Sequence, residues 1–298
     1  MVIRAVQARP EPRRECEVPQ AITGIVIPAF RAETLILGAV DSVLRQTSPA
    51  WEIWVVADDQ QDYETILGRA GRADPRLRFL STGMTGAGAS RARNLALDAM
   101  GTRYVAILDA DDRMKPEKLA RAETMLAEAP IVATALDVMD DSFAHLRYVG
   151  RGPDRILTPG GYKFVSLSMD SMIVWDREAT DARYDLEITN MTDLELLMRL
   201  WERADRIGWL GTPLHDYVKL TRSMSNGPGV TEKMIRSKEA LLRRIEAGHY
   251  RFAAPDAGEG LAEFLRISLK AEALFPEAMG ARPGLLFEDH LEPMLVRR

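Results

Sequence analysis

Short apolar runs alternate with stretches of helical periodicity through the first half of the chain. Branched and aromatic residues dominate the apolar runs, which predicts buried strands at residues 22–28, 53–57, 77–80 and 104–108. Between these runs, apolar residues recur every three or four positions and predict helices. Their inner faces are expected at Ile36, Val40, Val43 and Leu44, at residues 63–70, and at Ala92, Leu95, Ala96 and Ala99. Strands alternating with helices favour right-handed crossovers and a parallel, doubly wound α/β sheet.

The second half of the chain has a less regular pattern. It predicts a helix at 115–127, strands at 131–139, 143–149 and 171–175, and a loop rich in glycine and proline at 150–161. The clearest helix begins at Thr192, because Thr192 and Glu195 have the spacing of a reciprocal capping box. From about residue 231 two or three helices are expected, interrupted at 253–255 and at Phe275-Pro276. We therefore expect a flexible tail at 1–20, an α/β domain at 21–226 and a helical extension at 227–298.

Three carboxylates follow the apolar run at 104–108 within four positions. Asp109 and Asp111 stand one residue apart, so one can bind a metal ion while the other reaches it through water or holds a sugar hydroxyl. Ligands gather beyond the carboxyl ends of parallel strands, and a divalent cation relieves repulsion between crowded acids. The alternative is a solvated turn, since the DxD pattern alone is frequent by chance.

Two other polar segments lie near predicted strand ends. Asp58 and Asp59 follow the strand at 53–57, and one of them can accept a hydrogen bond from a nucleotide base. A turn or helix cap is the alternative, and it is preferred for Asp59. The glycine-rich segment 83–88 precedes a helix that carries Arg93, so backbone N–H groups can face a phosphate. The full GxGxxG pattern is missing, and a flexible surface loop would contain the same glycines.

Asp193 lies near the start of the helix that begins at Thr192. It precedes Leu197 by four residues, on the face that also carries Leu200 and Trp201, so the helix would direct its carboxylate toward the sheet. An acid in that position can act as the general base for an acceptor hydroxyl. The alternative is an interaction with the helix dipole alone, worth ~0.5 kcal/mol.

Composition and charge narrow the functional classes. The chain has 298 residues, of which 46% are hydrophobic, and a net charge of −5 that offers no broad basic field for nucleic acid. Cys16 is the single cysteine, and the four histidines show no metal-ligand spacing.

No secretory signal or membrane-spanning run is predicted, so we expect a cytoplasmic protein. The basic residues along 236–244, with glutamates among and beside them, favour a solvated helix face, and contact with an anionic inner membrane surface is the alternative.

Six segments, taken in order, resemble the family 2 glycosyltransferases, which have the GT-A fold of nucleotide-diphospho-sugar transferases. Each is modest alone, but their order and spacing are specific. The segments are 25–30 (first strand), 42–47 (end of the first helix), 52–56 (second strand), 88–94 (the GASRARN sequence), 108–112 with Pro116 (the metal motif), and Tyr184-Asp185 with TDLEL at 192–196 and Arg199 (the acceptor side).

The resemblance implies an inverting, metal-dependent transfer of sugar from a nucleotide-diphospho-sugar, a UDP-sugar, to a glycan or lipid-linked acceptor in surface polysaccharide or glycoconjugate synthesis. It implies that Asp193 is the catalytic base and that Asp111 binds Mn²⁺ or Mg²⁺. Asp58 would lie at the base, and Arg93 and Asp109 near the diphosphate and ribose. The implied nucleotide-sugar site consists of Pro28, Ala29, Glu33, Asp58, Arg93 and Asp109.

The chain also departs from the family pattern. ADDQ at 57–60 replaces a common Asp-Asp-Gly-Ser, and Thr192 replaces the glutamate before the base. Val218 and Leu220 replace an arginine and a histidine before the Ser-x-Ser segment at 223–225, leaving Lys219 or Arg222 as substitutes at the diphosphate. Two other readings therefore stay open: a sugar-nucleotide-binding or assembly protein that has lost catalysis, and a phosphohydrolase with Asp109 as nucleophile.

Overall fold

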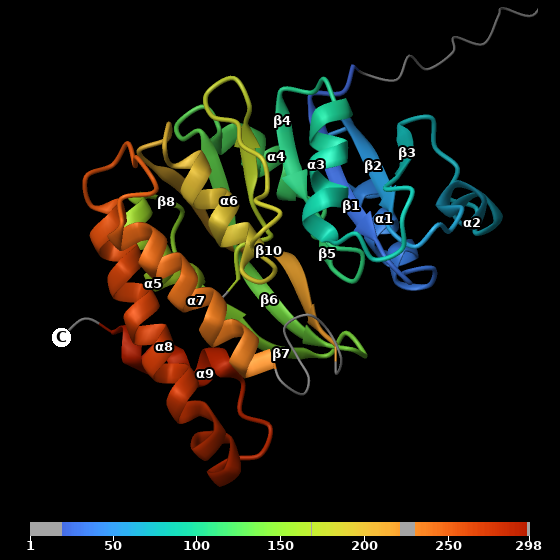
Figure 1. The fold of residues 1–298 in the computed structure, drawn as a ribbon. Helices are drawn as coiled ribbons and strands as arrows, with labels where there is room; N and C mark the ends of the chain where they lie inside the picture. Colours follow the sequence, from blue (N-terminus) through green and yellow to red (C-terminus); the bar gives the residue numbers. More distant parts are fainter. Residues whose placement is uncertain (1–19, 168, 221–229, 297–298) are drawn as a thin grey trace, which may run out of the picture.

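A ten-stranded mixed sheet forms the centre of the protein (Figure 1). The computed structural model describes residues 20–167, 169–220 and 230–296. The predicted tail, apart from Gln20, lies outside these residues, as do Cys16, Arg222 and the Ser-x-Ser segment. The strands are β1 (Thr23–Ala29), β2 (Trp51–Ala57), β3 (Leu77–Ser81), β4 (Tyr104–Ile107), β5 (Arg113–Met114), β6 (Ile131–Asp140), β7 (His145–Val149), β8 (Arg155–Leu157), β9 (Val174–Asp176) and β10 (Ile207–Lys219).

Helices cover the sheet, and further helices form an extension at the carboxyl end of the chain. They are α1 (Leu35–Leu44), α2 (Tyr63–Arg69), α3 (Ala89–Ala99), α4 (Lys118–Met125), α5 (Pro159–Ser166), α6 (Thr192–Leu200), α7 (Val230–Glu246), α8 (Ala257–Ala281) and α9 (Phe287–Leu295).

The sheet has the order β3-β2-β1-β4-β9-β6-β10-β5. Its first four strands are parallel, as the sequence predicts. The short strand β9 runs antiparallel to both β4 and β6, whereas β6 and β10 are parallel to each other. Strands β7 and β8 add antiparallel pairs to β6 and β10. The α/β fold is therefore confirmed, and each antiparallel pair among the described strands includes at least one of β7 to β10.

Both faces of the sheet are buried. Successive side chains of a strand point to opposite faces, so neighbouring residues pack into different cores. Ile25 and Ile27 of β1 pack into the core that contains residues of α1, α2 and α4. Val26, between them, packs into a second core with residues of α3, α6 and α8. The continuous apolar run of β1 reflects this position in the middle of the sheet.

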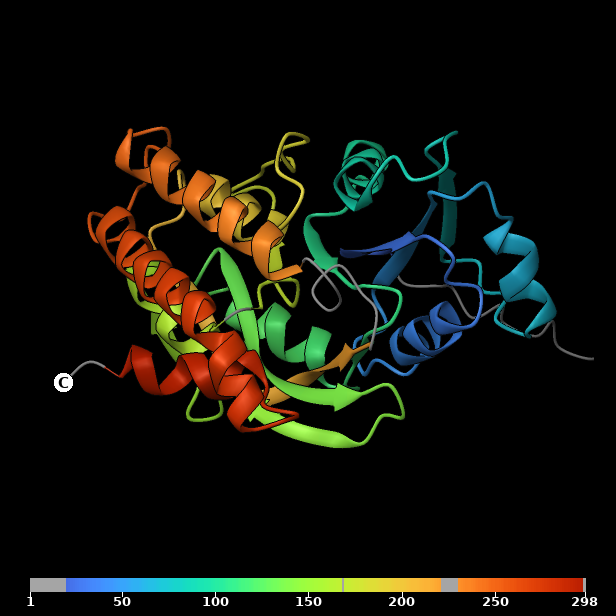
Figure 2. The ribbon, with the colours of Figure 1, turned by 60° about the horizontal axis from the view of Figure 1, so that its bottom comes forward.

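The helical extension packs beside α5 and α6, at the end of the molecule opposite α1 and α2 (Figures 1 and 2). Gly160 of α5 and Gly260 of α8 allow a close approach of the two helices. A Cβ atom on Gly260 would lie 2.3 Å from the Gly160 carbonyl oxygen, and one on Gly160 would lie 2.4 Å from the Asp256 carbonyl oxygen. The extension is thus held directly against the α/β core.

Several predicted elements differ from the structure. Helix α3 turns Arg93 inward and leaves Leu95 and Ala99 exposed, so the predicted apolar stripe is wrong at two positions. The predicted loop at 150–161 contains β8 and the start of α5. Helix α8 continues through Phe275-Pro276, so the predicted interruption there is wrong.

The capping box at the start of α6 does not form. Met191, in the left-handed region at φ 58°, is the N-cap residue, and no side chain caps the helix. The Thr192 hydroxyl instead faces Arg93 Nη1 at 3.5 Å, and Glu195 contacts Arg199. The contact of Thr192 with Arg93 and the contact of Glu195 with Arg199 take the place of the predicted capping hydrogen bonds.

Candidate functional site

Arg93 joins the two halves of the candidate active site. Its Nη2 donates to Asp109 Oδ1 at 2.5 Å, at the carboxyl end of β4. Its Nη1 lies 3.4 Å from Asp193 Oδ1, in the first turn of α6. The structure thus brings together three of the residues that the sequence singled out. Burial opposes the charge of Arg93, but the carboxylates of Asp193 and Asp109 outweigh it and raise its pKa well above the ordinary arginine value.

Asp193, the predicted base, accepts a hydrogen bond from one hydroxyl donor. Tyr184 Oη donates to Asp193 Oδ1 at 2.9 Å, and the Arg93 guanidinium carbon lies 5.0 Å from the centre of the Tyr184 ring. The Asp193 side chain is 19% exposed. Burial raises its pKa, and the positive charge of Arg93 limits the rise. A carboxylate with a raised pKa is a stronger proton acceptor than an ordinary aspartate.

The three acids after β4 have different surroundings. Asp109 is paired with Arg93. Asp112 is buried and accepts a hydrogen bond from the Val218 backbone N–H at 2.8 Å, and its Oδ2 lies 3.0 Å from Nε2 of His215. Burial raises the pKa of Asp112 well above its ordinary value, with the charges of its acidic neighbours adding to the rise. These contacts anchor the end of the acidic segment to β10.

Asp111 is the acid available to a ligand. Within the described part of the chain, its carboxylate makes no ion pair or hydrogen bond with another side chain. Burial and then the negative charge of Asp109 raise the pKa of Asp111 to about 6, so a nearby cation would be favourable.

The oxygen ligands at this position suit Mg²⁺ or Mn²⁺ bound together with phosphates. Such ions take one or two carboxylates and complete their shell with water and phosphate oxygens. Asp111, with Asp109 beside it, supplies that set. Among the described residues, no group of three or more His, Cys, Asp or Glu side chains is arranged to hold an ion without a ligand.

Asp58 holds the glycine-rich segment against the end of β2. Its Oδ1 accepts from Thr82 Oγ1 at 2.8 Å and from the Ala87 N–H at 2.9 Å. Its Oδ2 accepts from the Gly88 N–H at 2.8 Å, just before α3. Gly88 has φ 101°, which other residues rarely adopt. Contact of Asp58 with a nucleotide base stays a prediction.

We expect Asp58→Asn to loosen this segment, because the amide nitrogen that replaces one carboxylate oxygen is a donor and would face at least one of the three donors. The expected loss of stability is about 1–3 kcal/mol. Exchange of the amide hydrogens at 82–88 should quicken. Asp59→Asn is the matched control, since Asp59 serves the neighbouring turn through the Arg31 and Gln61 N–H groups and Tyr63 Oη. Unchanged exchange at 82–88 in Asp58→Asn would contradict this interpretation.

Two of the other residues predicted for the nucleotide-sugar site, Pro28 and Ala29, lie beside Asp58. Pro28 and Ala29 end β1, where the Ala29 carbonyl accepts from the Asp58 N–H at 2.8 Å. Glu33 is exposed and makes no described contact with the cluster at Arg93. Lys219, the predicted substitute at the diphosphate, is paired with Glu288 of α9 at 2.7 Å.

Two functional candidates had only weak sequence signals. Tyr184 stood in the acceptor-side resemblance without a role, and its contact with Asp193 joins positions nine residues apart through a loop. His215 was interpreted as ordinary. Its ring is buried between Asp112 and Lys118, whose Nζ lies 2.8 Å from His215 Nδ1. No motif around His215 indicates this arrangement.

Two further surface features lie away from the cluster. A cavity of about 250 Å³ beside α2 and β3 is lined by Tyr63, Phe79 and neighbouring residues, and none of the predicted site residues lines it. No helix in the described ranges is both long enough and apolar enough to cross a bilayer. On α7, Lys238 is buried and Arg244 faces Asp185, so two of the basic residues predicted for a membrane-facing surface point inward.

Comparison with known proteins shows that the sequence is similar to glycosyltransferases. A family model described as "Glycosyl transferase family 2" matches residues 24–166. The putative teichuronic acid biosynthesis glycosyltransferase TuaG of Bacillus subtilis (strain 168) is 25% identical over 232 residues, covering 77% of this chain and 90% of that protein. The UDP-Glc:alpha-D-GlcNAc-diphosphoundecaprenol beta-1,3-glucosyltransferase WfgD of Escherichia coli is 35% identical over 105 residues, covering 35% of this chain and 41% of that protein.

Solved structures share the fold. S. aureus TarS 1–349 in complex with UDP-GlcNAc has a TM-score of 0.63 at 15% identity, covering 92% of this chain and 79% of that one. The mannosyltransferase PcManGT from Pyrobaculum calidifontis, in complex with GDP-Man and Mn²⁺, has a TM-score of 0.58 at 16% identity, covering 93% of this chain and 85% of that one. At these identities the likeness concerns the fold alone.

Proposed function

Because this chain belongs to glycosyl transferase family 2 and has the GT-A fold, we propose that it transfers a sugar from a nucleotide-diphospho-sugar to a hydroxyl group, with inversion at the anomeric carbon. The observation that carries the proposal is the bridge made by Arg93 between Asp109 and Asp193. The Asp193 carboxylate, which we propose as the base, would then lie next to the strand end at which the donor would bind.

In the proposed reaction, Asp193 accepts the proton of the acceptor hydroxyl. The acceptor oxygen then forms a bond to the anomeric carbon, while the bond from that carbon to the diphosphate breaks and its electron pair leaves with the diphosphate. Tyr184 fixes the position of the base through its hydrogen bond to Oδ1. Oδ2 is then left as the atom that can accept the proton.

Arg93 and Asp111 would serve the donor. Arg93 Nε is buried without a hydrogen-bond partner among the described residues, and the arginine lies between the donor side and the base. We assign Asp111 as the protein ligand of Mn²⁺ or Mg²⁺, with Asp109 next to it. When bound, the metal would neutralise charge that develops on the departing nucleoside diphosphate.

The names of the relatives support a proposal for the donor and acceptor classes. WfgD is named for UDP-Glc and a diphosphoundecaprenol acceptor, and TarS was solved with UDP-GlcNAc. TuaG is named for teichuronic acid biosynthesis. We therefore propose a UDP-sugar donor and a glycan or lipid-linked acceptor of surface polysaccharide or glycoconjugate synthesis. Action in the cytoplasm, at the inner face of the membrane, would fit such an acceptor.

A thermal-shift screen of nucleotide sugars with and without Mn²⁺ tests this function. A donor present at about one hundred times its Kd should stabilise the fold by ~2.7 kcal/mol. We expect a UDP-sugar to give the largest shift, only with the metal, and to be consumed when an acceptor is added. A GDP-sugar as the best ligand would overturn the UDP assignment. Binding without turnover across acceptors would favour a protein that has lost catalysis, and release of free phosphate would favour a phosphohydrolase.

A further inference from the structure

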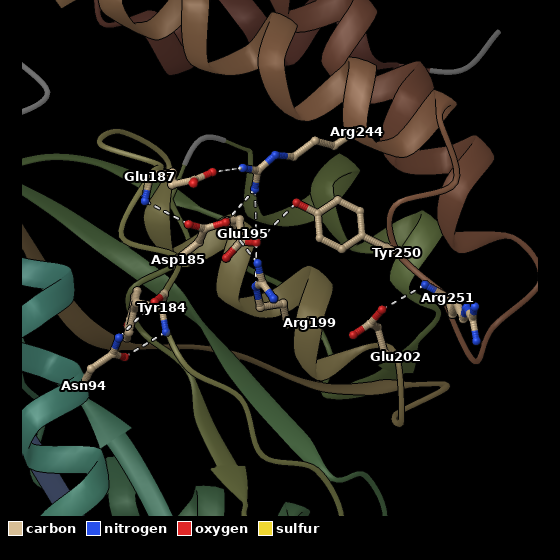
Figure 3. A network of polar contacts seen from close by, with 10 residues as sticks. All are labelled: Asn94, Tyr184, Asp185, Glu187, Glu195, Arg199, Glu202, Arg244, Tyr250 and Arg251. Atoms are coloured by element: carbon tan, nitrogen blue, oxygen red, sulfur yellow. Dashed lines mark hydrogen bonds and ion pairs between the residues drawn. The ribbon is translucent and has the colours of Figure 1, made fainter.

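The residue that follows Tyr184 connects the active site to the helical extension. The Asp185 carboxylate accepts from Arg199 Nη2 of α6 at 3.0 Å and from Arg244 Nη1 of α7 at 2.8 Å, both at Oδ2 (Figure 3). Its Oδ1 accepts from the Glu187 N–H at 2.8 Å. Asp185 is therefore held by a helix of the α/β core and by a helix of the extension at the same time.

A second buried carboxylate shares the same two arginines. Glu195, two residues after the proposed base, is fully buried, and its Oε1 accepts from Arg199 Nε at 2.7 Å and from Tyr250 Oη at 3.3 Å. Arg244 Nη1 lies 3.7 Å from the same oxygen. Burial raises the pKa of Glu195, and Arg199 opposes that rise. The buried Glu195 and the partly buried Asp185 thus depend on cations that α6 cannot supply alone.

The Tyr184 backbone is fixed from the other side by α3. The Asn94 side chain donates to the Tyr184 carbonyl at 2.9 Å and accepts from the Tyr184 N–H at 2.8 Å (Figure 3). The segment that carries the tyrosine therefore lies between Asn94, next to Arg93, and the pair formed by Asp185 and Arg244. Movement of either side would shift Tyr184 Oη relative to Asp193.

The position of Arg244 is itself determined by packing within the extension. Lys238 of α7 and Glu272 of α8 form a buried ion pair at 2.5 Å. The connection between the two helices is also tied to the end of α6, because the Arg251 N–H donates to Glu202 Oε1 at 3.0 Å and the Ala253 N–H donates to the Trp201 carbonyl at 2.9 Å. Helix α7 therefore presents Arg244 from a fixed scaffold.

We propose that Arg244 is a positioning residue for proton transfer at Asp193, so that the helical extension completes the acceptor side of the active site. It acts through Asp185 on Tyr184 and through Glu195 on the first turn of α6. This inference rests on the proposed role of Asp193 as the base. It assigns a function to a part of the chain that lies beyond residues 24–166, which the family model matches.

The test compares Arg244→Met and Arg244→Lys with Arg243→Met. Arg243 is the matched control, since it is 69% exposed and pairs only with Glu239 of its own helix at 3.8 Å among the described residues. We expect Arg244→Met to lower kcat by about 10 to 100 times, with the donor KM unchanged, because small misplacements of catalytic groups have effects of that size. Arg244→Lys should recover much of kcat, since a lysine can still pair with Asp185. Arg243→Met should behave as wild type.

A second measurement tests the positioning of Tyr184 and Asp193 independently of turnover. Hydrogen exchange at residues 184–195 should quicken in Arg244→Met and stay unchanged in Arg243→Met, with the melting temperature showing that both variants fold. Asp185→Asn should have the same effect, and the double variant should be no worse than the single one. Equal kcat and equal exchange in the two arginine variants, or a loss confined to the donor KM, would overturn the inference. An inactive wild type that still shows the exchange difference would overturn the proposed function instead.

Discussion

Replacing Asp193 with asparagine should lower kcat by ~10²–10⁴, the range expected when a general base is removed. The amide has nearly the shape of the carboxylate and can still accept the hydrogen bond of Tyr184, but it cannot take a proton at neutral pH. Arg93 keeps its contact with Asp109, so we expect the donor KM and the donor-induced thermal shift to stay close to wild type. Steady-state kinetics with varied donor and varied acceptor measures both effects.

The pH profile gives an independent check of the same assignment. Burial raises the pKa of Asp193, so kcat/KM of the wild type should fall on acidification at a pH above the ~3.9 of an ordinary aspartate. Asp193→Asn should lack that acidic limb. Asp205→Asn, the same change at an exposed residue remote from the cluster, is the control. Full turnover in Asp193→Asn would rule out Asp193 as the base.

Removal of divalent metal should have an effect of similar size. Charge stabilisation by a bound metal is worth several kcal/mol, so treatment with a chelator should lower turnover by ~10² or more. Asp111→Asn should raise the Mn²⁺ concentration needed for half-maximal rate, because the neutral amide is a poorer ligand for a hard cation. Added Mn²⁺ should restore the chelated wild type completely and the variant only in part.

The neighbouring acid provides a contrast for this second experiment. Asp109→Asn removes the partner of Arg93, so we expect it to weaken donor binding even when Mn²⁺ is saturating. Asp111→Asn should instead be sensitive chiefly to metal concentration. Activity that survives the chelator, together with an unchanged Mn²⁺ requirement in Asp111→Asn, would refute the assigned metal role.

Much of the fold was predictable because it depends on local pattern. The apolar runs that became β1 to β4 are buried on both faces, and a strand of that kind is continuous in sequence. Strand β10 was missed, although it is the longest strand described. Its register against β6 shifts on both sides of Pro213, so the apolar run is broken where the strand bulges.

The candidate site was predictable as a set of residues but not as an arrangement. Asp109, Asp111 and Asp193 follow from strand ends and helix periodicity. The inward turn of Arg93 does not, because the apolar stripe of α3 predicted a different buried face. A buried guanidinium needs carboxylate partners, and those of Arg93 come from the segment after β4 and from α6, which are distant in the sequence. The pairs of His215 with Asp112 and of Arg244 with Asp185 join residues 103 and 59 positions apart.

By itself, the sequence determined the parallel half of the sheet, the acids after β4, the segments that resemble family 2 glycosyltransferases, and the helical character of the extension. Periodicity and turn chemistry act over a few residues, so they can be recognised in the sequence without knowledge of the fold. The tertiary structure alone decided that Arg93 bridges Asp109 and Asp193, that Tyr184 donates to Asp193, and that α7 contacts the acceptor side. Those contacts depend on strand order and helix docking, which are set by long-range packing.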